Sequence, residues 1–164
     1  MKCDKNTFAE ILEKHRGIIH KVSMLYTNNR EDQEDLFQDI CFQICRSYNT
    51  FRDKAQFSTW LYRVALNTAI SQVRKNRSKT TSETFYENIH YASIKNDGND
   101  GQVQHLFKAI SRLNKIDKAL ILLWLEEKSY EEIADILGIS KSNVSVKLVR
   151  IKRSLSETIN SLKQ

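Results

Sequence analysis

The chain has 164 residues, a formal net charge of +6 and a pI near 9.2. With 40% hydrophobic and 9% aromatic residues, it can form one domain or two small ones around a modest core. No apolar run approaches the roughly 20 residues that span a bilayer, and the first residues lack the apolar stretch of a secretory signal, so we expect a cytoplasmic protein without membrane insertion, whose positive charge favours polyanions.

The sequence predicts an all-α protein. It contains no proline and only four glycines, so long helices can run unbroken and strands lack their usual turn residues. Apolar residues at helical spacing predict a first helix, which the polar residues 27–29 should end. Its predicted core residues are Phe8, Ile11, Leu12, Ile18, Ile19, Val22 and Leu25.

The second predicted helix has an acidic start, since residues 31–40 hold five acidic residues and no basic one. Asp32 or a neighbour should begin this helix. Carboxylates there have two interpretations: they stabilise the helix N-terminus through its dipole, or they form a docking face for a partner. The predicted buried residues are Leu36, Phe37, Ile40, Ile44 and Tyr48.

A basic and aromatic loop follows, around Phe51, Arg52 and Lys54. Such a loop can hold a backbone phosphate and stack on an extruded base, as single-stranded DNA binding requires. Phe51 can equally belong to the core. Ser58 is the predicted cap of a third helix. The residues expected to face inward on this helix are Trp60, Leu61, Val64, Ala65, Ile70 and Val73.

The third helix and its end are basic, and residues 57–81 contain no acidic residue. A row of positive charge along a helix can follow DNA phosphates, although a solvated charged face is the simpler explanation. The basic residues are Arg63, Arg74, Lys75 and Arg77.

A polar segment of about residues 78–101 is the predicted linker, and it keeps several aromatic and aliphatic residues. Four helices should follow in residues 102–164. In the first two of these, the predicted core residues are Val103, Leu106, Phe107, Ile110, Ile116, Ala119, Leu120, Leu123 and Trp124.

The last two predicted helices form a helix-turn-helix. Ser129 and Glu132 have the spacing of a capping box, Gly138 can end the first helix, and Ser140 can cap the second. Residues 141–153 hold five basic residues and no acidic one, which suits a recognition helix in the DNA major groove. The predicted buried stripe of that helix is Val144, Leu148, Ile151 and Leu155.

No catalytic or metal-binding set is apparent. The four histidines are scattered, and the three cysteines are odd in number and show no CxxC pair, so we expect no disulfide framework. Cys41 and Cys45 lie one helical turn apart and could share a metal, but beside Ile40 and Ile44 we expect them to pack as small hydrophobes. We therefore expect no metal, no cofactor and no enzymatic activity.

Three motifs carry a resemblance to a known family. They are EDLFQDI at residues 34–40, FSTWLYRVALNTAI at 57–70, and SYEEIADILGIS at 129–140, followed by the basic helix. Together they resemble the bacterial sigma-70 family, and the two-domain layout is similar to its extracytoplasmic-function (ECF) group. The resemblance covers nearly the whole chain apart from the linker.

The resemblance implies a sigma factor that binds core RNA polymerase and directs promoter-specific transcription initiation. Residues 1–77 would be a region 2-like domain that binds the polymerase and recognises and melts the minus-ten element, and residues 102–164 a region 4-like domain that recognises the minus-thirty-five element. It also leaves open a third partner beside polymerase and promoter DNA, an anti-sigma protein.

The resemblance assigns site residues to three surfaces. The polymerase-binding positions are Asp35, Gln38 and Asp39. The minus-ten positions are Phe51, Arg52, Lys54, Arg63, Asn67, Arg74 and Lys75. The upstream-element positions are Lys141, Asn143, Ser145, Val146, Lys147, Val149, Arg150 and Lys152.

Within the upstream set, Arg150 could contact guanine with two hydrogen bonds, and Lys141 and Lys152 fit phosphate contacts. Asn143 could contact phosphate or support the helix start. The family often has a basic residue at the position of Ser145 and a small polar one at that of Val146, so the preferred bases stay open.

The main alternative is a stand-alone helix-turn-helix repressor or activator whose first domain is a regulatory or dimerisation module. A more distant one is a nucleic-acid enzyme with an appended helix-turn-helix. Neither accounts for the tryptophan-containing motif together with the acidic helix.

Overall fold

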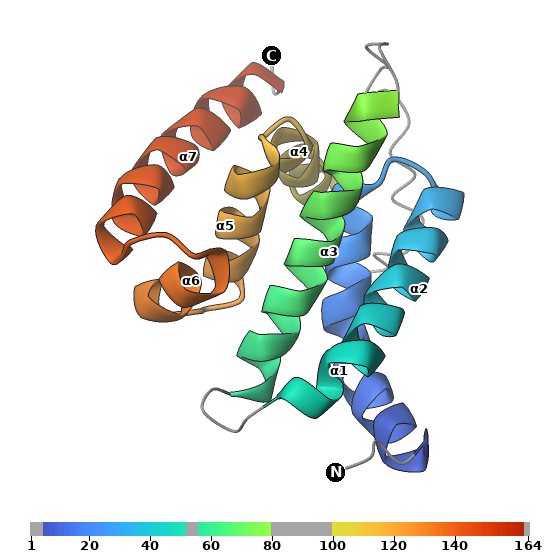
Figure 1. Ribbon diagram of the computed structural model, residues 1–164. Coiled ribbons are helices and arrows are strands. Elements are labelled where there is room, and N and C mark those ends of the chain that lie inside the picture. The colour runs from blue at the N-terminus through green and yellow to red at the C-terminus, as the bar shows by residue number, and fades with distance from the viewer. Residues whose placement is uncertain (1–4, 52–55, 80–99, 163–164) are drawn as a thin grey trace. The chain divides into compact units, whose positions relative to one another are not determined.

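The fold is seen in a computed structural model, which describes residues 5–51, 56–79 and 100–162 (Figure 1). The described residues form α-helices and one short 3-10 helix, with no strand among them, which confirms the all-α prediction. Internal contacts divide the chain into two units, residues 1–89 and 90–164. The predicted linker lies mostly outside the described residues, and its limits stay a prediction.

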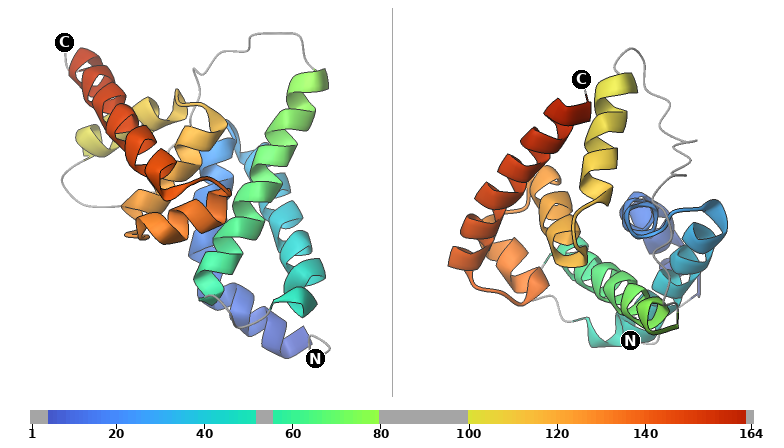
Figure 2. Two further views of the ribbon diagram at one scale, coloured as in Figure 1. Left: turned by 60° about the vertical axis from the view of Figure 1, so that its left-hand side comes forward. Right: turned by 90° about the horizontal axis from the view of Figure 1, so that it is seen from above.

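The first unit is a bundle of three helices, each packed against the other two. They are α1 (Lys5–Tyr26), α2 (Arg30–Ser47) and α3 (Phe57–Lys79), with the short 3-10 helix η1 (Tyr48–Thr50) after α2. Figure 2 shows these helices from two further sides. The core is mostly aliphatic, and its buried residues include Ile19, Val22, Leu36, Ile40, Ile44, Leu61, Ala65, Leu66 and Ala69, together with Tyr26 and Tyr62 and the small polar Ser23 and Thr59.

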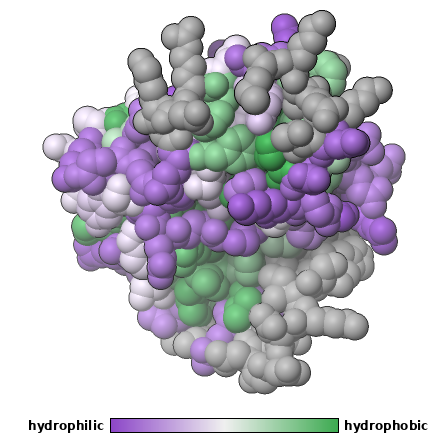
Figure 3. Space-filling model, turned by 90° about the horizontal axis from the view of Figure 1, so that it is seen from below, coloured by the Kyte–Doolittle hydropathy of each residue, from purple (hydrophilic) through white to green (hydrophobic). Residues whose placement is uncertain are grey.

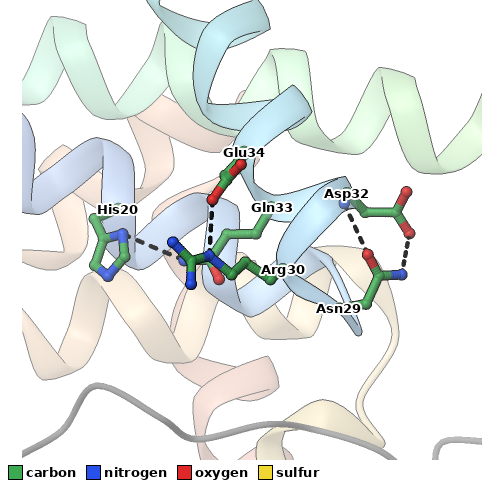
Figure 4. A network of polar contacts seen from close by, with 6 residues as sticks. All are labelled: His20, Asn29, Arg30, Asp32, Gln33 and Glu34. Atoms are coloured by element: carbon green, nitrogen blue, oxygen red, sulfur yellow. Dashed lines mark hydrogen bonds and ion pairs between the residues drawn. The ribbon is translucent and has the colours of Figure 1, made fainter.

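Side-chain contacts at the α1–α2 turn explain where α2 begins (Figure 4). The cap is Asn29, whose side-chain oxygen accepts the Asp32 backbone N–H at 2.8 Å, while its amide donates to the Asp32 carboxylate at 2.6 Å. Arg30 pairs with Glu34 at 2.8 Å, and the Gln33 amide lies 3.2 Å from the His20 ring. Asn29 therefore caps α2, which begins at Arg30, two residues before the predicted Asp32.

The third helix differs from the sequence prediction at its start and in its core face. It begins at Phe57, so Ser58 lies in its first turn and does not precede it; the Gln56 carbonyl accepts the N–H groups of Thr59 and Trp60 at 3.0 and 3.2 Å. The buried face lies one residue further round the helix than expected, which adds Tyr62, Leu66 and Ala69 and leaves Trp60, Val64, Ile70 and Val73 half-buried. Before α3, the predicted core residues that are only half-buried are Phe8, Ile11, Leu12, Ile18, Leu25, Phe37 and Tyr48.

The second unit contains the four predicted helices: α4 (Asp100–Ser111), α5 (Lys115–Leu125), α6 (Tyr130–Leu137) and α7 (Lys141–Leu162). α5 packs on α4, α6 and α7, and its Ala119, Leu120, Ile121 and Leu123 are buried. The predictions for Val103 and Trp124 were wrong, because each side chain is 36% exposed. Trp124 lies off the buried face of α5, near the end of the helix.

The helix-turn-helix forms as predicted. Ser129 and Glu132 make the reciprocal capping box of α6, and Gly138 ends that helix in the left-handed conformation at φ 67°. The Ser140 hydroxyl accepts the Asn143 backbone N–H at 3.1 Å and so caps α7. The predicted stripe of α7 is buried in full, which fixes the side of this helix that faces outward.

Candidate polymerase and nucleic-acid interfaces

The acidic face of α2 is exposed. Asp35, Gln38 and Asp39 all reach solvent, on the side of α2 away from its buried residues. Asp39 accepts a hydrogen bond from the Gln72 amide of α3 at 2.7 Å, whereas Asp35 has no hydrogen bond or ion pair with any described residue. Of the three predicted docking residues, Asp39 is thus oriented by a hydrogen bond from α3, whereas Asp35 and Gln38 have no hydrogen bond or ion pair with that helix.

Sequence reasoning missed Phe42 in this region. Its ring is 64% exposed, and it lies on α2 three residues after Asp39 and seven after Asp35. At about 100° per residue, it sits nearly opposite the buried stripe, between Gln38 and Asp35 around the helix, and Asp39 lies on the far side of Asp35. The signal was present in the sequence, since the period of Leu36, Ile40 and Ile44 leaves position 42 outside the core.

The two described cysteines behave differently. Cys41 is half-buried, and burial raises the pKa of its thiol despite the nearby Arg16 cation. Cys45 is exposed, so the expectation that both thiols pack as small hydrophobes was wrong for this one. The reason is its place on α2, one residue beyond Ile44 and facing outward.

An aromatic cluster joins the two ends of the segment between η1 and α3. The Phe51 ring lies 5.3 Å from both Phe57 and Trp60, and the latter two rings are also 5.3 Å apart. His15 of α1 lies 4.9 Å from Phe57. Burial, with a smaller effect from Lys14, lowers the pKa of His15, so the neutral ring is the form that packs here. These contacts engage Phe51 within the unit, and its DNA role stays a prediction.

The other residues predicted to contact the minus-ten element lie on or beside α3. Asn67 and Arg74 are exposed, Arg63 is half-buried, and the three share one helix face by their spacing. Lys75 is exposed on a neighbouring face. Arg52 and Lys54 lie outside the described residues, as does the side chain of Arg77.

Most basic residues of α7 already have partners inside the second unit. Lys141 pairs with Glu131, and this hydrogen bond lowers the pKa of the Glu131 carboxyl. Lys147 is half-buried and lies 3.9 Å from Asp117 of α5.

The two bases nearer the end of α7 are engaged as well. The Lys152 ammonium sits 4.8 Å from the centre of the Trp124 ring, a cation–π contact, and Arg153 is 3.4 Å from Glu157. Among the described residues, only Arg150 of the five bases between residues 141 and 153 has no hydrogen bond, ion pair or cation–π contact. Arg150 is therefore the one base on α7 that no neighbouring side chain holds.

The remaining upstream positions also face solvent. Asn143, Ser145, Val146 and Val149 are exposed, so every predicted residue in this set except Lys147 lies open on α7.

Figure 3 shows one face of the molecule, on which hydrophobic side chains reach the surface between hydrophilic ones. No helix in the described part of the chain combines the length and apolar character of a membrane span.

Comparison with known proteins places both units in one family. Residues 11–79 match the model of Sigma-70 region 2, and residues 104–155 match that of Sigma-70, region 4. The chain is 24% identical to the ECF RNA polymerase sigma factor SigW of Bacillus subtilis, over 98% of this chain and 93% of the relative. It is 26% identical to the ECF RNA polymerase sigma-E factor of Haemophilus influenzae, over 97% and 90%.

Solved structures share the fold. The sigma factor RpoE of Bartonella quintana, in complex with the anti-sigma factor NepR, superposes with a TM-score of 0.72 at 20% identity, over 93% of this chain and 96% of that one. CnrH, in complex with the cytosolic domain of CnrY, gives a TM-score of 0.70 at 18% identity, over 97% and 91%. With the two family matches and the ECF relatives, these findings decide between the alternatives: the chain belongs to the sigma-70 family, in its ECF group, and is a sigma factor of RNA polymerase rather than a stand-alone repressor.

Proposed function

We propose that this sigma factor divides its work between its two units. The first binds core RNA polymerase through α2 and traps melted minus-ten DNA beside α3, and the second reads the minus-thirty-five duplex through α7. The observation that carries this division is the opposite charge of two outward faces on two separate units, acidic on α2 and basic on α7. An acidic face repels DNA and suits a basic protein surface, whereas a basic face attracts phosphate.

The polymerase contact centres on the exposed acids of α2. Asp35 is open to a partner, and Asp39 is oriented by its hydrogen bond from Gln72. Phe42 adds an apolar side chain among them. An aromatic residue surrounded by charge is a common arrangement at the centre of a protein interface, where it supplies contact area while the charges steer the encounter.

The melting step uses the α3 side of the first unit. Each base captured from the duplex gains about 1–3 kcal/mol of stacking, against an unpairing cost of a few kcal/mol. Capture therefore becomes favourable only when the polymerase already holds the DNA in place. The exposed Asn67 and Arg74 support this role with one amide that can pair with a base edge and one cation that can pair with phosphate.

The upstream contact uses α7 as a recognition helix in the major groove. Arg150 is placed to donate two hydrogen bonds to a guanine, because it is exposed and has no competing partner among the described residues. Lys141 and Lys152 lie at the edge of the outward face and suit phosphates. The half-buried Lys147 is better suited to holding α7 against α5 than to reading a base.

The activity is binding, not bond chemistry, and the proposed place of work is the cytoplasm, where core polymerase and promoter DNA are found. An anti-sigma protein is a further proposed partner. Two structures with the same fold are complexes of this kind or carry a bound cytosolic domain, namely RpoE with NepR and CnrH with CnrY.

Reconstitution tests the proposal. The purified chain is added to core polymerase with a library of promoter fragments, and run-off transcripts are mapped. We expect initiation at a defined subset of promoters and no footprint on them by the chain alone at the same concentration. Unchanged start sites would reject the division of work between the two units.

A further inference from the structure

Two valines stand out on the recognition helix. Val146 and Val149 are 56% and 64% exposed, although valine is among the residues most often buried. At about 100° per residue, Val146 lies nearly opposite the buried stripe of α7, and Val149 and Arg150 lie on either side of it. The stripe that defines this geometry is Val144, Leu148, Ile151 and Leu155.

This placement puts apolar surface at the centre of the face that would enter the DNA. The bases at the edges of α7 are held by Glu131, Asp117 and Trp124, which keeps their cationic groups to the sides. The central positions therefore hold the two valines, the unpaired Arg150 and, further along the helix, Arg153, which pairs with Glu157. Since residues 141–153 contain no acidic residue, the charge around the valines favours a polyanion over an apolar protein surface.

In the major groove, only one kind of apolar group lies on a base edge, the C5-methyl of thymine. Resting on the proposed role of the second unit, we propose that Val146 and Val149 contact thymine methyl groups in the upstream element. The protein then prefers thymine at the one or two base pairs that face these side chains. Arg150 reads an adjacent guanine on the same face.

The preference has an attractive and a repulsive part. A methyl group removed from water against valine contributes favourable burial. A valine opposite adenine, guanine or cytosine instead covers hydrogen-bonding atoms of the base edge, and it offers them neither donor nor acceptor. Both parts act in the same direction, toward thymine.

The test removes single methyl groups from the DNA. Holoenzyme, reconstituted from the full chain and core polymerase, first selects from a promoter library whose upstream element is randomised. Each thymine in the selected element is then replaced, one at a time, by deoxyuridine, which pairs identically but lacks the methyl. We expect holoenzyme affinity to fall about threefold to fivefold at one or two positions and to be unchanged at the others.

Protein variants connect these positions to the valines. In V146A and V149A holoenzymes, deoxyuridine at the matching position should cause no further loss, because the contact is already gone. V146T keeps the shape of the side chain but only one of its two methyl groups, so it should weaken the thymine preference without abolishing it while folding normally, as shown by thermal unfolding. V103A is the matched control: Val103 is another exposed valine of the same unit, on α4, and its replacement should leave the deoxyuridine effect intact.

Distinct outcomes overturn distinct claims. If the selected element is well defined but deoxyuridine has no effect anywhere, or the same effect in the alanine variants, the valine contact is wrong and the upstream role of α7 stands. If holoenzyme initiates but shows no sequence preference in the randomised element, the proposed role of the second unit fails, and the valine contact fails with it.

Discussion

α2 and α7 belong to different units and carry opposite charge, yet their outward faces are built alike. Each buries an aliphatic stripe on one side and exposes apolar side chains on the other, Phe42 on α2 and Val146 with Val149 on α7. Charged and polar residues lie beside the apolar ones in both cases. On the proposed functions, charge would select the class of partner and the exposed apolar side chains would make the close contact.

The two helices differ in how their charges are held. On α7, four of the five bases between residues 141 and 153 have partners within the unit, and Arg150 alone among them has none in the described structure. On α2, Asp35 has no such partner. The bases of α7 are therefore mostly held by neighbouring side chains of the same unit, whereas Asp35 on the acidic face can adjust to a protein surface.

The largest expected effect comes from reversing the charge of the acidic face. Replacing both Asp35 and Asp39 by Lys places like charges against a basic partner, which costs several kcal/mol. We expect the affinity for core polymerase, measured by fluorescence anisotropy, to fall roughly a hundredfold or more. The matched control reverses Glu10 and Glu13, two exposed acids of α1, and should have little effect. Unchanged affinity of the α2 variant would reject this docking face.

On the basic face, the largest single effect should come from Arg150→Ala. Loss of a bidentate contact to guanine costs about 1–3 kcal/mol, roughly 5- to 150-fold in upstream recognition. Association with core polymerase should be unchanged, because α2 lies in the other unit. Arg112→Ala, at an exposed arginine outside α7, controls for the loss of one positive charge. Equal loss of both activities in the Arg150 variant would indicate misfolding instead.

Phe42→Ala tests whether the central apolar residue matters on the acidic face as well. Truncating an aromatic residue at the centre of an interface typically costs 1–2 kcal/mol, so affinity for core polymerase should fall about tenfold. Phe42→Leu should recover most of it, since a large apolar side chain remains. The thermal stability of the unit should hardly change, because the ring is already 64% exposed. Normal binding by the alanine variant would leave the acids alone as the contact.

The positions of the helices and the caps of the helix-turn-helix were predictable from the sequence because they depend on local periodicity and short-range hydrogen bonds. The capping box at Ser129, the left-handed Gly138 and the buried stripe of α7 all followed from spacing, and the structure confirms them. The α3 face was less predictable. Several apolar residues there compete for the core, and packing against α1 and α2 selects Tyr62 and Leu66 over Trp60 and Val64.

The partners of the charged residues of α7 could not be predicted, because these ion pairs and cation–π contacts join side chains on different helices. No spacing rule places Asp117 of α5 beside Lys147, or Trp124 beneath Lys152. A local feature was missed as well: Glu127, just after α5, has φ 58°, a conformation that favours glycine. Spacing alone does not distinguish the bases of a recognition helix; the family resemblance singled out Arg150, and the structure adds that only this base has no partner among the described residues.

The smallest expected effect concerns a paired base on α7. Glu131→Gln releases Lys141 and removes a negative charge near the DNA-facing side, so upstream binding should strengthen about twofold to threefold at low salt. The gain should shrink as salt rises, because exposed charges are then screened. Electrophoretic mobility shifts of holoenzyme over a salt series measure both effects.

The unfolding temperature of the Glu131→Gln variant separates this effect from a change in folding. Glu131 lies in the first turn of α6, where a carboxylate stabilises the helix by about 0.3–1 kcal/mol, so the variant should unfold at slightly lower temperature while it binds DNA more tightly. Glu13→Gln, which breaks an exposed pair with Arg16 in the first unit, should leave upstream binding unchanged. Weaker DNA binding by Glu131→Gln would mean that the carboxylate holds Lys141 in position for phosphate, and preorganisation, not competition, would then explain the paired bases of α7.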